Sequence, residues 1–309
     1  MQDDRSLNLE DAWTLYWRLG NTSSCVDGEA DSAALYDVWL KFFSQLPSGA
    51  AVLDLATGNG FVARVASTAS QTHGLDLNVT GVDAAEISPP EMPEGRFVSK
   101  VRMEALPFDD FSFDIVVSQF GFEYGARAEC ASEAGRVLKP GGQLRLVLHA
   151  RAGAVHQAIS AQVARLEVVL KQDGLVRTLR TAADAEAEAA RRVDLMLAAC
   201  WEKSQRALAG APDEDAASFY ANGLTNLWRA RHRYAPTDLQ RSIDDAQRRA
   251  EGILVRQRAL LRAACSQEDV GHICGLLRAA SVDTRDPSPI TDNEGRQIAW
   301  LVKGSKRSS

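Results

Sequence analysis

The residues best suited to bind a small molecule are two aspartates. Each lies at or next to the end of a short apolar run, and a glycine turn follows the first run. Asp54 is the last residue but one of the run AVLDL, which is followed by ATGNG, and this places Gly58 and Gly60 at the start of a helical stretch. Backbone N–H groups at such a turn can bind a polar ligand, and glycine lets the ligand approach closely. Asp83 ends a second run, VTGVD, about twenty residues further on, where a carboxylate can accept two hydrogen bonds from a ribose diol. The arrangement predicts an adenosine-containing cofactor and fits both a nicotinamide dinucleotide and S-adenosylmethionine.

The elements around these acids alternate in the manner of a parallel sheet with crossover helices. Apolar runs of strand length are separated by helical stretches between residues 50 and 149. The expected strands are residues 51–55, 78–82, 96–99, 113–119 and 143–149. Because ligands of such sheets bind at the carboxyl ends of the strands, both aspartates are expected at that edge.

A different pattern follows in residues 151–265, which contain no expected strand. Apolar residues repeat there at a helical period among many Ala, Arg, Glu and Leu, and we expect roughly three to five helices. Breaks are expected at LAGAPDED and RYAPTD, where Gly, Pro and acids cluster. Ser266 and Asp269 then predict a capping box, and an antiparallel hairpin is expected around TDNEG. The predicted domains are a helical cap (1–49), a cofactor-binding domain (50–150 and 266–309) and a helical insertion (151–265).

Four motifs follow one another in the α/β part. They are VLDLATGNG, GVDA, MEALPFDDFSFDIVVSQFGFEY (residues 103–124) and RVLKPGGQLRLVLH (residues 136–149). In this order the sequence resembles the class I S-adenosylmethionine-dependent methyltransferases, particularly the group acting on small molecules. The resemblance covers about residues 50–149 and returns weakly in the C-terminal hairpin. It implies a Rossmann-like α/β fold of seven strands with a C-terminal antiparallel hairpin, here with a long helical insertion after strand five, and S-adenosylmethionine as the cofactor.

The resemblance also implies roles for single residues. The loop that holds the methionine end of the cofactor corresponds to Asp54, Ala56, Gly58 and Gly60. The ribose and adenine would be bordered by Asp83, Ala84, Met103 and Glu104, and Gln119 would lie where cofactor and substrate meet. Many relatives carry an acid before the position of Met103 to bind the adenine amino group, whereas this sequence has Arg102. Either Glu104 or a backbone carbonyl takes that role, or the cofactor binds less tightly.

The chemistry of methyl transfer restricts what a catalytic residue must do. Transfer from a sulfonium is an in-line displacement, so positioning supplies most of the acceleration and a base is needed only when the acceptor loses a proton. The candidates for such a base are Glu123, Tyr124 and His149, with His156 in the first inserted helix. Each of them could equally be a packing residue, as a strand-end histidine often is. The cysteines and histidines lack metal-site spacing, so no metal is expected.

Two further segments could shape the substrate site. AWTLYWRLGN (residues 12–21) places Trp13, Tyr16 and Trp17 on one helical face, and in the enzymes that the sequence resembles such a helix closes over cofactor and substrate. A helix that only packs against the domain would carry the same aromatic face. The helical insertion could form a substrate lid or pack against a second subunit in a homodimer. Its basic stretch RARHRY could clamp an anionic substrate but is explained more simply by cations at a helix C-terminus.

Composition limits the classes of partner that the protein can have and indicates its cellular compartment. The net charge of -6 and the absence of a (D/N)PP(Y/F) tetrapeptide argue against nucleic acid as a partner. The five cysteines are scattered and no run approaches the roughly 18 apolar residues of a membrane span, which favours a cytoplasmic protein without a membrane partner.

The sequence therefore favours a methyltransferase acting on a small-molecule acceptor, at oxygen before nitrogen. One alternative is a non-catalytic protein of the same fold whose helical insertion binds a partner, motivated by Arg102 and by the long apolar seam from Ile243 to Ala264. The other is a nicotinamide-dependent oxidoreductase, against which the second half shows no further βαβ unit.

Overall fold

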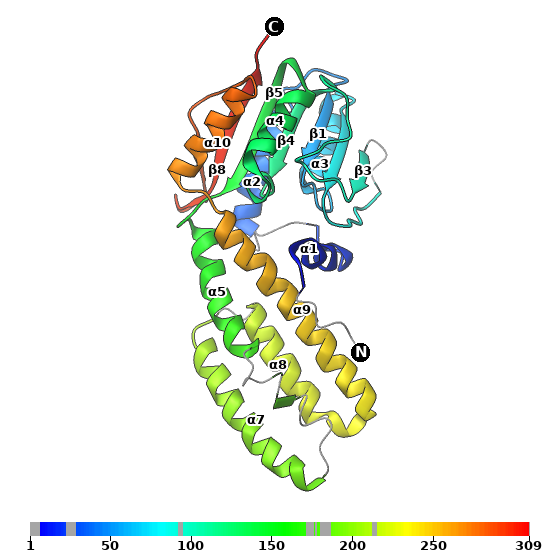
Figure 1. Ribbon diagram of the computed structural model, residues 1–309, viewed down its shortest axis with the longest axis vertical. Coiled ribbons are helices and arrows are strands. Elements are labelled where there is room, and N and C mark those ends of the chain that lie inside the picture. Colours follow the sequence, from blue (N-terminus) through cyan, green and yellow to red (C-terminus); the bar gives the residue numbers. More distant parts are fainter. Residues whose placement is uncertain are drawn as a thin grey trace. The chain divides into compact units, whose positions relative to one another are not determined.

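The computed structural model describes residues 7–22, 29–91, 95–170, 176, 178–179, 187–211 and 215–308. The chain divides into two compact units, and Figure 1 labels most of their helices and several of their strands. The α/β unit is formed by Trp13–Gln157 and Ala259–Ser309, and the helical unit by Met1–Ala12 and Ala158–Arg258.

The α/β unit is built on one mixed sheet. Its strands are β1 (Ala51–Leu55), β2 (Asn78–Asp83), β3 (Gly95–Ser99), β4 (Phe113–Gln119), β5 (Leu138–His149), β6 (Val282–Thr284), β7 (Ser288–Thr291) and β8 (Gln297–Lys306). Hydrogen bonding gives the order β3-β2-β1-β4-β5-β8-β6, with β7 paired to β8. Strands β1 to β5 are parallel to their neighbours among themselves, whereas β8 runs antiparallel to β5, β6 and β7. The predicted parallel sheet with a C-terminal antiparallel hairpin is confirmed.

The structure adds one strand to the seven expected, since the described residues form eight. The additional strand is β6, which has only three residues and includes the exposed Asp283, so it lacks a readable apolar pattern. It pairs with the end of β8, where Val282 lies opposite Lys306. The fifth strand also begins earlier than expected. Its first residue, Leu138, pairs with Phe113, and the ladder resumes at Gln143 after a register shift in which Gly141 has a φ of 77°.

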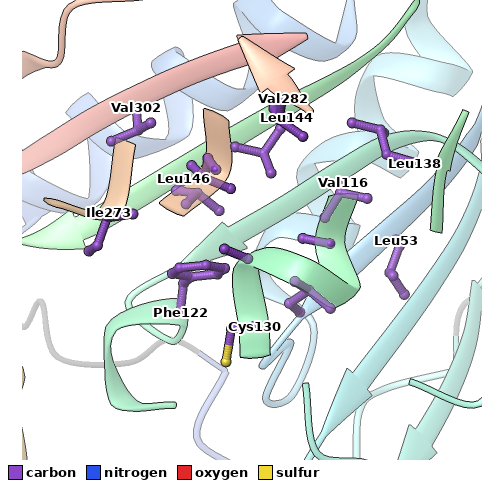
Figure 2. Packing of buried hydrophobic residues seen from close by; sticks show 14 of the residues in the cluster. Leu53, Val116, Phe122, Cys130, Leu138, Leu144, Leu146, Ile273, Val282 and Val302 are labelled. Carbon is purple, nitrogen blue, oxygen red and sulfur yellow. The ribbon is translucent and has the colours of Figure 1, made fainter. Parts of the chain in front are cut away.

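The main hydrophobic core lies between the sheet and two helices, α4 (Arg127–Val137) and α10 (Gln267–Ala279). Leu53 and Val116 reach it from the strands, and Cys130 and Ile273 reach it from the helices (Figure 2). Phe122 joins the same core from the short 3-10 helix η1 (Phe122–Tyr124). This packing fixes the segment that follows β4 at the carboxyl edge of the sheet.

Local signals explain where the helices begin and end. Helix α3 (Phe61–His73) lies between Gly60 and Gly74, both in the left-handed conformation, and the Gly74 N–H donates to Ser70 O. Helix α10 begins with the predicted capping box, in which the Ser266 and Asp269 side chains each accept from the other's backbone N–H. Helix α2 (Glu29–Phe43) packs against α3.

The helical unit contains α7 (Ala187–Leu208) and α8 (Ala216–Arg229) and the larger parts of α5 (Ala154–Leu170) and α9 (Pro236–Ala263). Both predicted breaks are confirmed, on either side of α8. Asp215 caps α8 by accepting from the Ala217 N–H at 2.9 Å, and its other oxygen accepts from the Arg165 guanidinium at 2.5 Å. Within the described ranges, every helix is too short or too polar to span a bilayer.

Candidate functional site

The carboxyl ends of β1 and β2 bring Asp83 against the glycine loop. The Gly58 N–H donates to Asp83 Oδ2 at 2.9 Å, and the Ala85 N–H donates to Asp83 Oδ1 at 2.8 Å. Burial raises the pKa of Asp83 to about 6, although these two hydrogen bonds act in the opposite direction. Asp83 therefore holds the loop after β1 with one carboxylate and retains lone pairs for a ligand.

Asp54 lies beside it at the end of β1 and is 1% exposed. The Thr57 hydroxyl donates to Asp54 Oδ2 at 2.6 Å, whereas Asp54 Oδ1 has no hydrogen-bond partner within the described part of the chain. Burial raises the pKa of Asp54 to about 7, the Thr57 hydrogen bond opposes this rise, and the Asp83 charge adds to it. A buried acceptor of this kind is stabilised by a ligand that brings an N–H donor and a positive charge.

Left-handed backbone conformations cluster at this edge of the sheet. Ala56 has a φ of 53° and Gly58 a φ of 54° in the loop after β1, and Phe120 has a φ of 55° at the end of β4. A Cβ added to Gly121 would overlap that of Ala56, so the loops after β1 and β4 touch. Non-glycine residues rarely adopt this conformation, and such strain gathers at ligand-binding sites.

A small cavity of about 20 Å³ lies among these elements. Its lining includes Asp54, Ala56 and Gln119 together with Trp17 of α1 (Leu9–Arg18). Gln119 is fixed there because Trp39 Nε1 donates to its Oε1 at 2.6 Å. Gln119, the last residue of β4, thus lines the same cavity as Asp54 and Ala56, and its role toward cofactor and substrate stays a prediction.

The segment after β3, which carries Met103 and Glu104, lies beside Asp83. The Val101 N–H donates to the Asp83 carbonyl at 2.9 Å, and Ala84 is partly buried next to it. Glu104 already has partners, because its Oε1 accepts from the Ala126 N–H at 3.1 Å and its Oε2 lies 3.8 Å from the Arg102 guanidinium. Met103 packs against the main core. The role of these residues toward adenine stays a prediction.

The three candidate catalytic residues form one cluster. Glu123 Oε1 accepts from both the backbone N–H and the Nδ1 of His149, each at 2.8 Å, and both side chains are buried. The His149 ring stacks on Phe120 with centroids 4.1 Å apart, and Tyr124 meets it edge-on at 6.0 Å. Trp13 meets Tyr124 edge-on at 6.3 Å. The cluster therefore joins β5, η1 and α1.

Sequence reasoning missed two residues. Asn59 lies between the two loop glycines, and its side chain donates to the carbonyls of Trp17 and Asn21 at 2.9 and 2.7 Å. The sequence signal that could have identified Asn59 is its position as a polar residue between two glycines. Trp39 contacts Gln119 across 80 positions, and no local pattern can predict such a contact.

The basic stretch at the end of α8 has a local role. The Arg231 guanidinium lies 4.3 Å from the centre of the Trp228 ring and donates to the Trp228 carbonyl at 3.2 Å. This agrees with cations completing a helix C-terminus. No group of three or more metal-ligating side chains occurs among the residues that the structure describes.

Residues 53–146 match the family model described as a methyltransferase domain. Demethylmenaquinone methyltransferase of Thermotoga maritima is 38% identical over 98 residues, which are 30% of this chain and 41% of that protein. The ubiquinone/menaquinone biosynthesis C-methyltransferase UbiE of Xanthomonas oryzae is 32% identical over 126 residues, 38% of this chain and 50% of that protein. The chain thus spans at most half the length of these curated relatives.

Several solved structures resemble the chain over most of its length, and one of them contains S-adenosylhomocysteine. It is the Burkholderia thailandensis 1,6-didemethyltoxoflavin-N1-methyltransferase with bound 1,6-didemethyltoxoflavin and S-adenosylhomocysteine. The two proteins are 12% identical, the similarity covers 97% of this chain and 87% of that chain, and the TM-score is 0.47.

Proposed function

We propose that this chain, whose residues 53–146 form a class I S-adenosylmethionine-dependent methyltransferase domain, transfers a methyl group from S-adenosylmethionine to a small-molecule acceptor, at oxygen in preference to nitrogen. The observation that carries the proposal is the loop after β1. There the Gly58 N–H is held by Asp83, while Asp54 Oδ1 is buried without a hydrogen-bond partner in the described chain.

The residues of this loop fit the cofactor. The cofactor carries an ammonium group and a ribose diol, and Asp54 Oδ1 supplies the acceptor for the first. An unsatisfied buried acceptor costs about 1–3 kcal/mol, which a ligand N–H donor removes. Each oxygen of Asp83 accepts one backbone N–H and has a lone pair left for a ribose hydroxyl.

The sheet favours this cofactor over a nicotinamide dinucleotide. In a dinucleotide-binding sheet the second half continues with parallel strands beyond the switch point. Here β5 is followed in the sheet by β8, which is antiparallel to it. The chain lacks, in its described residues, the second parallel half that would hold the nicotinamide.

The mechanism divides into binding and proton transfer. When bound, the cofactor supplies an electrophilic methyl group. Asp54 and Asp83 orient it, and Gln119, held by Trp39, borders the place where the acceptor approaches. His149 is held by Glu123 through Nδ1, and we assign to its ring the role of the base that takes the proton of an acceptor hydroxyl. Glu123 is a positioning residue in this proposal.

The favoured acceptors are aromatic compounds with a hydroxyl group. Such an acceptor loses a proton as it is methylated, which a histidine fixed by a buried carboxylate can remove. Two relatives are named for menaquinone or ubiquinone biosynthesis, and one of them is a C-methyltransferase. Quinols and simple phenols are therefore the first compounds to screen, and the position of the new methyl group distinguishes methylation at oxygen from methylation at carbon.

The test uses the full chain in two steps. Calorimetry first measures binding of S-adenosylmethionine, S-adenosylhomocysteine and NAD, and transfer of a labelled methyl group to the phenol and quinol panel is then followed by product analysis. Binding of both sulfur nucleosides with transfer to a hydroxyl supports the proposal. Binding of NAD alone overturns it, and binding of the nucleosides without transfer to any compound of a broad metabolite panel favours the non-catalytic alternative.

A further inference from the structure

The aromatic face of α1 rests on the loop that the proposed function assigns to the cofactor. Residues 13–18 of this helix belong to the α/β unit. A Cβ added to Gly58 would stand 2.5 Å from Trp17 Cη2, so the indole ring lies directly against this glycine. Trp17 also packs with Ala85 and Ile87, which follow Asp83 in the chain. The indole therefore occupies the space above the glycine loop.

The cavity that the described residues enclose beside this loop is too small for the cofactor. The cavity lined by Trp17, Asp54 and Gln119 measures about 20 Å³. This volume holds about one water molecule, whereas sites for ligands of this size measure about 300–1,000 Å³. In this conformation α1 closes the place where the cofactor would bind.

Buried hydrogen bonds hold α1 in that position. Asn59 is 1% exposed; it donates through Nδ2 to the Trp17 and Asn21 carbonyls, and its Oδ1 accepts from the Ser88 N–H at 2.9 Å. The Arg64 guanidinium donates to the Asn59 carbonyl at 2.7 Å and to the Thr22 carbonyl at 2.6 Å. One residue of the glycine loop and one of α3 thus bind the C-terminal end of α1 to the loop itself.

We propose that Trp17 and Asn59 form a latch, so that S-adenosylmethionine binds only after α1 has moved off Gly58. This inference rests on the proposed function, because it concerns the same site. A ligand that binds only the open state has an apparent affinity reduced by the fraction of molecules that are open. Weakening the latch therefore tightens cofactor binding and speeds it.

The first test replaces the indole. In Trp17→Ala, S-adenosylhomocysteine should bind with a Kd about tenfold lower than in the wild type, measured by calorimetry. In stopped-flow experiments the wild-type binding rate should level off at high ligand concentration, at the rate of latch opening, whereas the rate in Trp17→Ala should keep rising. Leu19→Ala is the matched control, since Leu19 follows the same helix and is 53% exposed; it should bind like the wild type.

A second variant keeps the indole and breaks the hydrogen bonds. Asn59→Asp can still accept from the Ser88 N–H but cannot donate to the carbonyls of Trp17 and Asn21. It should lower the Kd in the same direction and raise amide hydrogen exchange in residues 13–18, a readout that requires no ligand.

The outcomes separate the latch from the proposed function. Weaker binding in Trp17→Ala would show that the indole contacts the bound cofactor, and unchanged binding in both variants would show that nothing obstructs entry; either result overturns the latch. Absence of binding in the wild type and in both variants overturns the proposed function instead.

Discussion

The buried carboxylate of Asp54 should make cofactor binding depend on pH. Burial raises its pKa to about 7, and the neighbouring Asp83, with a pKa of about 6, adds to the effect. The ionised form pairs with the ammonium group of the cofactor, so the protonated form must first lose its proton. Affinity should therefore rise as the pH rises through these values and level off above about pH 7.

The size of the effect follows from the ionised fraction of Asp54. With a pKa of about 7, about 3% of the side chain is ionised at about pH 5.5 and about 90% at about pH 8, so the apparent Kd should fall roughly thirtyfold over this range. The assay is calorimetry with S-adenosylhomocysteine at several pH values. Repeating it in buffers of different ionisation enthalpy measures the protons that binding releases. Asp54 should contribute nearly one proton at the acid end, and Asp83 should add a further fraction.

Asp54→Asn is the decisive variant, because the amide keeps the shape of the side chain and removes the titration. Its Kd at about pH 8 should be weaker than that of the wild type, and its pH dependence should shrink to the part contributed by Asp83. Asp283→Asn is the matched control, since this aspartate lies on β6, pairs with Arg307 and is exposed. A wild-type Kd that stays constant over this range, or an Asp54→Asn variant with the wild-type slope, would refute the reasoning.

The raised pKa of Asp54 should also make the stability of the ligand-free protein depend on pH. A carboxylate whose pKa is raised in the folded state stabilises the protein below its unfolded pKa of about 3.9, and this contribution is lost as the pH rises through about 7. The melting temperature of the ligand-free protein should therefore fall between about pH 4 and pH 7. Asp54→Asn should reduce this fall to the part contributed by Asp83 and raise the free energy of unfolding at neutral pH by up to about 4 kcal/mol.

Three further changes test other parts of the structure. Asp83→Ala should weaken S-adenosylhomocysteine binding by about 1.5 to 3 kcal/mol, because it removes an acceptor for the ligand and for the loop; an unchanged binding curve would remove Asp83 from the site. His149→Gln should lower turnover of a hydroxyl acceptor at least about a hundredfold while the cofactor Kd stays within about twofold, and steady-state kinetics with normal turnover would exclude the histidine as a base. Asp215→Ala should lower the free energy of unfolding of the helical unit by about 2 to 4 kcal/mol, because α8 loses its cap and Arg165 loses its carboxylate partner. A urea titration measures this loss, and a value below about 0.5 kcal/mol would contradict the role of this pair.

The elements that the sequence predicts well are those with a strong local pattern. The branched runs at residues 51–55 and 113–119 coincide with β1 and β4 because buried parallel strands are continuously apolar. The capping box at Ser266 was readable because its two residues are three positions apart and bind each other. In the candidate site, the strand ends that carry Asp54 and Asp83 were predictable for the same reason.

The contacts that complete the site were not predictable, because they join distant parts of the chain. The helical period places Trp13, Tyr16 and Trp17 on one face of a helix but does not predict which residues contact that face. In the structure, Trp17 contacts the glycine loop and Trp13 contacts the Tyr124 ring. Strand β6 was not predictable for a different reason: three residues are too few to show an alternation of apolar and polar side chains.

The two aspartates show why burial alone does not identify a binding group. Both have a raised pKa, but the oxygens of Asp83 are bound by backbone N–H groups of its own surroundings, whereas Asp54 Oδ1 is left without a partner in the described chain. Trp17 and Asp54 line the same small cavity, so the indole limits the water beside this carboxylate to about one molecule.

Removal of the indole should therefore change the titration of Asp54 as well as the access to it. In Trp17→Ala, water reaches the carboxylate, its ionised form is better solvated, and its pKa falls toward the ordinary value. The midpoint of the pH dependence of S-adenosylhomocysteine binding should then move below the wild-type value of about 7. Calorimetry over the same pH range measures this midpoint, with Leu19→Ala as the control. A variant that binds more tightly but keeps the wild-type midpoint would mean that α1 blocks the cofactor without drying Asp54, and the raised pKa would then have to come from the strands around it.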